Sequence, residues 1–297
     1  MKKFKKLAGA ITALVTPFQK NGKVDVKTLK KLVDFQIESR IDGLVPCGST
    51  GEAATLTLEE HELVVRTVVE QTKGRVPVIA GAGSNDTHKA IVLSKLCKKA
   101  GANALLHVTP YYNKPTPDGL VAHYKAVANA VNLPIILYNV PGRTGANIPA
   151  SVTLRVAKEV PHVVGVKEAS GNIDQMTDII KGSSADFSVL SGDDSFTYPL
   201  IALGGDGCIS VVSNEVPKEF SDLIRAALSK DFETAKTLHF KLLDLMRVNF
   251  IETNPLPVKT ALSLMGKIEE VFRLPLVPMT AKNKEALKEV LKKQKLM

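Results

Sequence analysis

Short apolar runs alternate with longer amphipathic stretches along most of the chain. The apolar runs are rich in Val, Ile, Leu and Ala and are continuous rather than alternating, a pattern that is typical of strands buried on both faces of a parallel sheet. We therefore predict eight parallel strands, within residues 9–15, 43–48, 76–83, 104–110, 134–140, 163–169, 187–192 and 207–212.

The stretches between these runs have the 3.6-residue spacing of helices, for example at 25–40, 57–73 and 86–100, with Asp25, Thr57 and Asp86 as expected N-caps. Eight strand–helix units predict an α/β fold, a (β/α)₈ TIM barrel, over residues 1–229. Helical stretches at 231–250, 254–266 and 280–297 then predict a C-terminal helical region over residues 230–297. A doubly wound open sheet is the alternative, but it usually carries a Gly-rich phosphate loop, and none follows the first apolar run.

The composition agrees with one large barrel and narrows the class of protein. The chain has 297 residues, 44% of them hydrophobic, which is enough to bury a full core. No uninterrupted apolar run is long enough to span a bilayer, so we expect no membrane association. The N-terminal MKKFKKLAGAITALV resembles a signal peptide, but Gly9 and Thr12 interrupt its apolar part. We interpret it as a basic tail followed by the first strand.

The net charge of +9 lies mostly at the two ends of the chain. MKKFKK contributes +4, and residues 280–297 contribute another +4 from six lysines and two glutamates. The body of the chain is therefore nearly neutral and has few aromatic residues, which disfavours a nucleic-acid groove. Basic ends of this kind are usually solvated.

Cysteine and histidine spacing excludes the common metal sites. Cys47, Cys97 and Cys208 are widely spaced and form no C-x-x-C motif, which fits a reducing, cytoplasmic environment. The histidines form no H-x-x-x-H motif. We therefore expect no metal site.

Polar residues follow the apolar runs at the positions where a barrel has its active site, the C-terminal ends of its strands. The second run ends in GSTGE (48–52), the fourth in TPYYN (109–113), the fifth in YNVPGRTG (138–145), the sixth in Lys167 and Glu168, and the seventh in SGDD (191–194). These residues are expected to meet on one rim.

Lys167 stands out because it ends an apolar strand. Strict alternation places it on the same face as Val163 and Gly165, facing into the barrel, where Gly165 would leave room beside it. Burial lowers the pKa of an ammonium, and the neutral amine can form a Schiff base with a ketone. The alternatives are a lysine that reaches the rim or one that is paired with a carboxylate such as Glu168.

Hydroxyl groups near such a lysine could move the protons that imine formation requires. Tyr138 ends the neighbouring strand and is either a member of such a relay or an ordinary core tyrosine. In GSTGE, the amides and hydroxyls of Ser49 and Thr50 could hold a carboxylate, although the segment could equally be a plain tight turn.

Two charged segments leave alternatives open as well. Arg143 lies on a loop constrained by proline and glycine, where it could bind a carboxylate through both nitrogens or simply be solvated. Asp193 and Asp194 could suggest a metal site, but a turn after the strand is the preferred interpretation because no third ligand lies near in sequence.

The ordered motifs GSTGE, TPYY, YNVPGRTG, GVKEASGN and LSGDD resemble those of the pyruvate-dependent class I aldolases, the family that includes N-acetylneuraminate lyase and dihydrodipicolinate synthase. The resemblance covers the chain from ALVTPF to NPLPVKTAL. Within the family, YNVPGRTG with its arginine is most similar to the synthase branch. The other branches, which act on sialic acid or 2-keto-3-deoxy sugar acids, are the alternative.

This resemblance implies roles for individual residues. Lys167 would form the Schiff base with pyruvate, and the resulting enamine would attack L-aspartate 4-semialdehyde in a step of lysine biosynthesis through diaminopimelate. Tyr138, Ser49 and Tyr112 would form the proton relay, with Tyr112 contributed by a neighbouring subunit of a homotetramer built from two tight dimers. The residues that would bind or line the substrates are Thr50, Arg143, Gly192 and Ile209. The resemblance implies no metal and no organic cofactor.

Two positions depart from the pattern of the synthase branch. Ser49 stands where the synthases usually have threonine and the lyases serine, so the hydroxyl is kept. At the interface site where lysine inhibits many family members, His61 matches a ligand, but Lys89 replaces a glutamate and Leu58 replaces a histidine found in some members. The added cation implies weak or absent inhibition by lysine.

Overall fold

The structure of the chain is a computed structural model that describes residues 6–297. Most of the predicted basic tail, residues 1–5, lies outside the described residues. Lys6 is described, and its ammonium forms an ion pair with Asp206 at 2.7 Å.

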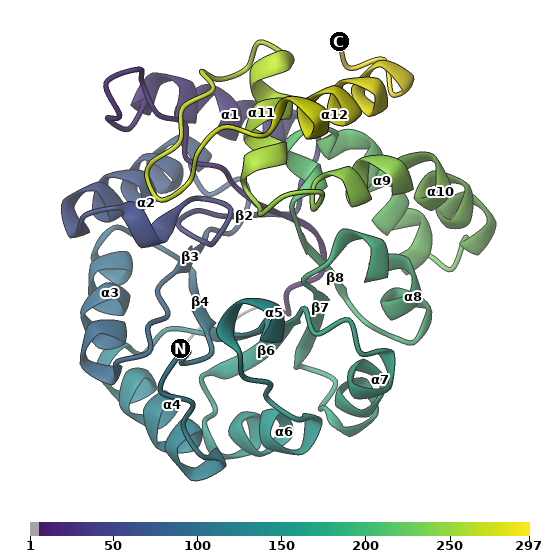
Figure 1. The fold of residues 1–297 in the computed structure, drawn as a ribbon. Coiled ribbons are helices and arrows are strands. Elements are labelled where there is room, and N and C mark those ends of the chain that lie inside the picture. The colour runs from purple at the N-terminus through teal and green to yellow at the C-terminus, as the bar shows by residue number, and fades with distance from the viewer. Residues whose placement is uncertain (1–5) are drawn as a thin grey trace.

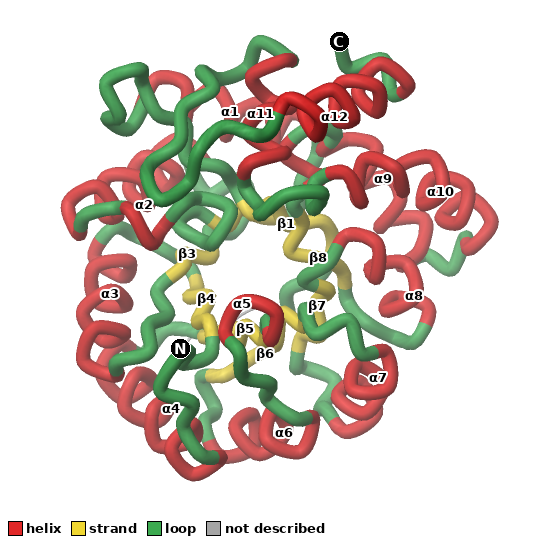
Figure 2. Tube along the Cα trace, viewed as in Figure 1, coloured by secondary structure: helices red, strands yellow, loops and turns green. Residues whose placement is uncertain are grey.

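Eight parallel strands form the centre of the molecule, as the sequence predicts (Figures 1 and 2). Their order in the sheet is β2-β1-β8-β7-β6-β5-β4-β3. A parallel bridge between Leu44 and Val78 joins the two outer strands of this order and closes the sheet into a barrel. The strands are β1 (Gly9–Ala13), β2 (Gly43–Val45), β3 (Ile79–Gly81), β4 (Ala104–Val108), β5 (Ile135–Asn139), β6 (Val163–Glu168), β7 (Ser188–Ser191) and β8 (Gly207–Ser210).

Helices alternate with the strands and surround them as a ring (Figure 2). The three expected N-caps are confirmed: Asp25, Thr57 and Asp86 accept from backbone amides in the first turns of their helices, and Thr57 forms a complete capping box with Glu60. The helices are α1 (Val26–Glu38), α2 (Leu58–Thr72), α3 (Thr87–Lys99), α4 (Pro117–Val131), α5 (Pro141–Thr144), α6 (Ala150–Glu159), α7 (Ile173–Gly182), α8 (Thr197–Ala202), α9 (Pro217–Leu228), α10 (Phe232–Val248), α11 (Leu256–Leu264) and α12 (Ala281–Lys293), with short 3₁₀ turns at Ala53–Thr55, Asp194–Phe196 and Val212–Asn214.

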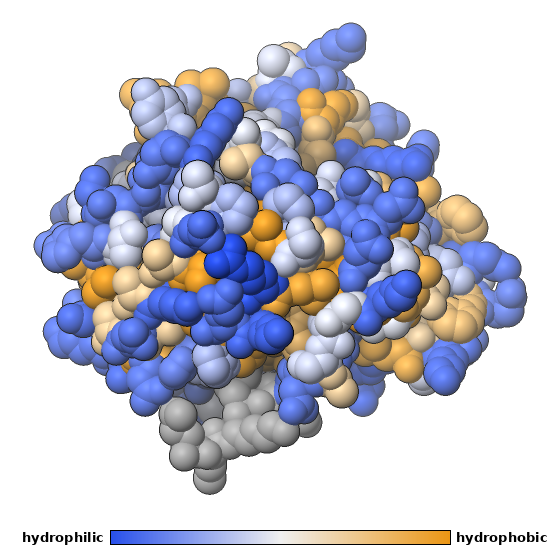
Figure 3. Space-filling view, turned by 90° about the horizontal axis from the view of Figure 1, so that it is seen from below, coloured by the Kyte–Doolittle hydropathy of each residue, from blue (hydrophilic) through white to orange (hydrophobic). Residues whose placement is uncertain are grey.

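Two apolar layers hold the barrel together. The inner layer fills the barrel with side chains such as Ile11, Ile136 and Leu190, and the outer layer packs the helices against the strands. On the side of the molecule in Figure 3, hydrophilic residues cover most of the surface and apolar residues show between them, as expected for helices whose apolar faces turn inward. No helix within residues 6–297 is both long and apolar enough to span a bilayer.

The orientation predicted for the start of β6 is wrong. Val163 packs in the outer layer, whereas Val164 lies against the inner one. The pairing with β5 explains the difference, because Ile135 pairs with Val163 but the next residue, Ile136, pairs with Gly165. This shift in register breaks strict alternation, and Lys167 still faces inward because Gly165 and Lys167 follow the irregularity.

The three C-terminal helices form where the sequence predicts them: α10 packs against α9, and α12 packs against α10 and α11 (Figure 1). The C-terminal lysines do not form a separate tail: all of them except Lys295 belong to α12, whose Leu287 and Leu291 are fully buried. Lys284, for example, forms an ion pair with Glu270. The division of the chain after residue 229 stays a prediction.

Candidate active site

The pair at the C-terminal ends of β5 and β6 is the centre of the site. Tyr138 and Lys167 are direct register partners, so both side chains project from the same level of the barrel. The ammonium Nζ of Lys167 lies 4.3 Å from the centre of the Tyr138 ring. The exposed fraction is 5% for Lys167 and 7% for Tyr138. The sequence-based expectation of a buried inward-facing lysine beside a tyrosine is therefore confirmed.

The expected alternative, a pair between Lys167 and Glu168, does not form. The Glu168 carboxylate accepts hydrogen bonds from Asn139 Nδ2 at 3.0 and 3.2 Å, Gln175 Nε2 at 3.1 Å and the Ser170 amide at 2.7 Å. None of the ion pairs within residues 6–297 includes Lys167. The lysine is thus buried without a carboxylate partner among the described residues.

A different glycine from the one expected makes room for Lys167. A Cβ atom on Gly192 would lie 3.0 Å from Lys167 Cε and 3.1 Å from Cγ. A Cβ on Gly165 would instead meet Ser188 O at 2.7 Å and Ile136 Cδ1 at 3.2 Å. Gly165 therefore allows close packing inside the barrel, and Gly192 is the residue that accommodates the lysine.

The GSTGE segment after β2 forms a tight turn with two available amides. Gly51 N–H donates to Gly48 O at 3.1 Å, and Glu52 N–H donates to Ser49 O at 3.1 Å. Within residues 6–297, the N–H groups of Ser49 and Thr50 have no protein acceptor. The side chain of Ser49 is exposed, whereas Thr50 is buried and its Oγ1 accepts from Asn254 Nδ2 at 3.0 Å. The turn could hold an anion through its backbone, as a carboxylate site requires.

Arg143 lies on the short helix α5 rather than on the constrained loop that its glycines suggest. Its Nη2 donates to the backbone oxygen of Asn254 at 2.9 Å. This bond fixes the guanidinium at the mouth of the barrel while its side chain remains exposed. The remaining donors suit a carboxylate ligand.

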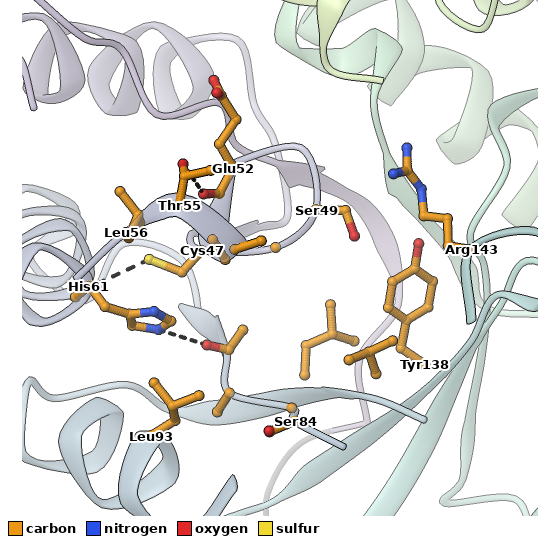
Figure 4. Close-up of a pocket in the computed structure, with 18 of the residues that line it drawn as sticks. Cys47, Ser49, Glu52, Thr55, Leu56, His61, Ser84, Leu93, Tyr138 and Arg143 are labelled. Carbon is orange, nitrogen blue, oxygen red and sulfur yellow. Dashed lines mark hydrogen bonds between the residues drawn. The ribbon is translucent and has the colours of Figure 1, made fainter. Parts of the chain in front are cut away.

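A cavity of about 760 Å³ opens at this end of the barrel. Figure 4 shows Ser49, Tyr138 and Arg143 gathered at one side of it, and His61 and Cys47 at the other. Lys167, Thr50, Gly192 and Ile209 do not line the cavity themselves. Lys167 lies against the Tyr138 ring, which lines the cavity, and Gly192 lies against Lys167. Ile209 belongs to the same inner apolar layer as Tyr138.

Two buried residues, His61 and Cys47, line the other side of the cavity. His61 Nε2 bonds to Gly81 O at 2.8 Å, and desolvation lowers the pKa of this histidine. Burial raises the pKa of the neighbouring thiols of Cys47 and Cys97, the latter to about 12. Neutral groups of this kind are structural rather than nucleophilic. Lys89 also lines the cavity.

Tyr112 is the expected site residue that lies outside this group. Its side chain is 90% exposed, and its backbone has a φ of +68°, in the left-handed region that non-glycine residues seldom adopt. The neighbouring Tyr111 lines the cavity instead. Within one chain, therefore, Tyr112 does not join Tyr138 and Ser49.

The aspartates after β7 form a turn, as preferred from the sequence. Asp193 Oδ1 accepts from the Ser195 amide at 2.8 Å, and buried Asp194 accepts from the amides of Val211 and Val212 at 3.2 and 2.8 Å. Burial raises the pKa of Asp194 to about 6. No cluster of three or more potential metal ligands occurs in the described part of the chain.

Sequence reasoning missed two residues that contact the site from the C-terminal region. Asn254 bonds to both Thr50 and Arg143, and Lys259 on α11 forms a fully buried ion pair with Glu52. Lys259 carries the same signal as Lys167, a lysine within an apolar segment (PLPVKTALSL). Asn254 has no comparable signal, because its contacts come from distant parts of the chain.

The chain is similar to known proteins over nearly its whole length. The model of the dihydrodipicolinate synthetase family matches residues 6–294. The 4-hydroxy-tetrahydrodipicolinate synthase of Maridesulfovibrio salexigens is 57% identical over 284 residues, which cover 96% of this chain and 97% of the relative.

Solved structures show the same fold. The dihydrodipicolinate synthase of Aquifex aeolicus has a TM-score of 0.95 and 48% identity, covering 98% of this chain and 99% of that chain. The chloride-inhibited dihydrodipicolinate synthase of Acinetobacter baumannii, solved in complex with pyruvate, has a TM-score of 0.95 and 46% identity over the same shares of the two chains.

Proposed function

The chain belongs to the dihydrodipicolinate synthetase family, and from this membership we propose that it condenses pyruvate with L-aspartate 4-semialdehyde to form 4-hydroxy-tetrahydrodipicolinate. The enzyme is then a lyase of the class I aldolase type that acts in the diaminopimelate route to lysine. Its relatives carry the name of this synthase, so the sibling reactions on sialic acid and sugar acids are not favoured.

The observation that carries the proposal is the buried Lys167 without an acidic partner, next to Tyr138. Without a carboxylate bound to it, the amine of Lys167 is available to a ketone ligand, with which it can form a Schiff base. The neutral Nζ attacks the ketone carbon of pyruvate, and the carbinolamine loses its hydroxyl as water. The product is an imine between Lys167 and pyruvate.

Imine formation needs proton transfers that the hydroxyl groups can provide. The oxygen of the carbinolamine must take up a proton before it leaves, and the nitrogen must lose one. Tyr138 and Ser49 are the groups of this chain that we assign to this transfer, and Tyr112 of a neighbouring subunit would complete the relay. The 90% exposure of Tyr112 supports this assignment, because a side chain directed away from its own subunit is available to another.

Each of the two substrates carries a carboxylate, and we assign a separate group of hydrogen-bond donors to each carboxylate. The free amides of Ser49 and Thr50 would hold the carboxylate of pyruvate, and Arg143 would hold that of the semialdehyde. Gly192 and Ile209 would line the site near the imine.

The carbon–carbon bond then forms between the two bound substrates. Loss of a proton from the methyl group of the imine gives an enamine, whose carbon attacks the aldehyde carbon of the semialdehyde. The aldehyde oxygen takes up a proton and becomes the 4-hydroxyl group. The amine of the former semialdehyde attacks the imine carbon and displaces Lys167, which closes the ring and regenerates the free lysine.

We propose a homotetramer built as a dimer of dimers. Two separate groups of exposed apolar side chains support it, because exposed apolar side chains that gather on one face mark contact surfaces. The first group, at or beside the cavity, is Leu58, Tyr111 and Tyr112. The second is Ile173 on α7, Leu203 directly after α8 and Phe240 on α10, and α8 contacts both of the other helices. A cytoplasmic location is proposed from the three free, buried cysteines.

Turnover of pyruvate and L-aspartate 4-semialdehyde, coupled to a reductase that consumes the product, tests the function. The parent protein should be active and Lys167→Ala should not. A folded parent that fails to turn over this pair of substrates would contradict the proposal.

A further inference from the structure

The most deeply buried lysine of the described chain is not the one assigned to catalysis. Lys259 on α11 has an exposed fraction of 0%, and its Nζ lies 2.5 Å from Glu52 Oε1. The same ammonium donates to Val271 O at 2.7 Å and lies 4.3 Å from the centre of the Phe18 ring. Both side chains of the pair are withdrawn from water.

Stability alone does not explain such a pair. The free energy needed to remove two charges from water is about as large as the free energy gained from their attraction. Well-packed apolar residues of similar volume often stabilise a folded protein equally well or better. The position of Glu52 points to another role, since it is the last residue of the GSTGE turn that we assign to pyruvate binding.

The conformation of Glu52 depends on bonds from outside the turn. Its φ is +52°, a left-handed conformation that a non-glycine residue seldom adopts without support from its surroundings. Its Oε1 is bound by Lys259 and its Oε2 by the backbone N–H of Arg273 at 3.3 Å. Both carboxylate oxygens are therefore held by the C-terminal region.

The C-terminal region also binds the turn at Thr50. Asn254 Nδ2 donates to Thr50 Oγ1 at 3.0 Å. Both anchors belong to the turn whose Ser49 and Thr50 amides lack a protein acceptor in residues 6–297. A displacement of Glu52 would change the direction of those amides, because only one residue separates Glu52 from Thr50.

We propose that Lys259 is a positioning residue for the pyruvate-binding turn and acts through Glu52. The inference rests on the proposed function, since it requires that the amides of Ser49 and Thr50 bind the pyruvate carboxylate. The C-terminal helices are then part of the catalytic apparatus, although Lys259 contacts neither substrate.

The test uses the double variant Glu52→Gln/Lys259→Met of the full-length protein, which leaves no unpaired buried charge. The readout is the pyruvate concentration that gives half-maximal trapping on Lys167 by borohydride, which requires no second substrate. We expect this concentration to rise about tenfold or more, the effect of losing hydrogen bonds worth about 1.5 kcal/mol at the turn. The KM for the semialdehyde should change much less.

A matched control separates positioning from general stability. Asn249→Ala removes the 2.6 Å bond to buried Glu215, another link between the barrel and the C-terminal region that does not involve the turn. This variant should lower the melting temperature and leave the half-maximal pyruvate concentration unchanged. If this double variant folds poorly, Glu52→Gln/Lys259→Leu, which likewise leaves no unpaired buried charge, should still raise that concentration.

The outcomes are distinguishable. A parent that traps pyruvate, with folded Glu52 variants that trap it at the same concentration, overturns the role of Lys259 alone. An equal rise in Asn249→Ala also overturns it, because the effect would then be one of stability. A parent that forms no adduct overturns the proposed function and this inference with it.

Discussion

The ammonium of Lys167 lies 4.3 Å from the centre of the Tyr138 ring, and the two residues are register partners on neighbouring strands β6 and β5. The ring therefore forms one wall of the space that holds the buried amine. The hydroxyl of the same tyrosine lies toward Ser49 and Arg143 (Figure 4). Tyr138 therefore connects the buried nucleophile to the cavity.

Tyr138→Phe should separate these two roles, because it keeps the ring and removes the hydroxyl. We expect kcat to fall about 100-fold or more, the usual contribution of a proton-transferring group, while the pyruvate adduct still forms slowly. Steady-state kinetics and borohydride trapping measure both. Tyr124→Phe is the control, since Tyr124 packs in the outer layer on α4 and does not line the cavity. A kcat close to that of the parent would remove Tyr138 from the relay.

Arg143→Ala should affect the second substrate only. The KM for the semialdehyde should rise about 10- to 100-fold, as expected when a charge-assisted hydrogen bond worth about 1.5–3 kcal/mol is lost. The pyruvate concentration for half-maximal trapping should stay the same. Arg155→Ala, which removes an arginine paired with Asp118 and Glu159 on the outer surface, serves as the control. An equal loss of pyruvate binding would show that Arg143 does not discriminate the two substrates.

Tyr112 allows a test by mixing two inactive variants. Tyr112→Phe and Lys167→Ala should each have low activity, but dimers that contain one subunit of each regain one complete site if Tyr112 acts in the neighbouring subunit. Random reassembly should then restore about a quarter of the parent activity, because half of the dimers are mixed and half of their sites are complete. No recovery after confirmed subunit exchange would place Tyr112 outside the neighbour's site.

Inhibition by lysine should be weak or absent. Lys89 lines the same cavity as His61, and its ammonium would repel that of a lysine ligand. Lys89→Glu should increase the sensitivity, whereas Lys95→Glu, at an exposed position on the same helix, should not. An inhibition constant for L-lysine below the millimolar range in the parent would contradict this prediction.

The order of the elements could be read from the sequence because each strand of the barrel is an apolar run bounded by polar segments. All eight strands and the N-caps at Asp25, Thr57 and Asp86 are where local pattern predicts them. The side of the barrel wall toward which the Val163 side chain points could not be predicted from the local pattern. It depends on the register between β5 and β6, which is a property of two strands rather than one.

The same difference between local pattern and tertiary packing applies to the residues of the site. Lys167 and Tyr138 could be predicted as site residues because both lie near the C-terminal end of a strand, and the barrel brings these strand ends together. Asn254 and Lys259 reach the site from the C-terminal region, and their partners Thr50 and Glu52 are more than two hundred residues away in sequence. Contacts of that kind follow from tertiary packing, which a single sequence does not specify by local pattern.

The most direct test of the account is the position of the covalent adduct formed when the parent protein is reduced with borohydride in the presence of pyruvate. Peptide mass spectrometry should find the adduct on Lys167 and should find none in Lys167→Ala. An adduct on another lysine, such as the buried Lys259, or no adduct in the folded parent would contradict the assignment of Lys167 as the nucleophile.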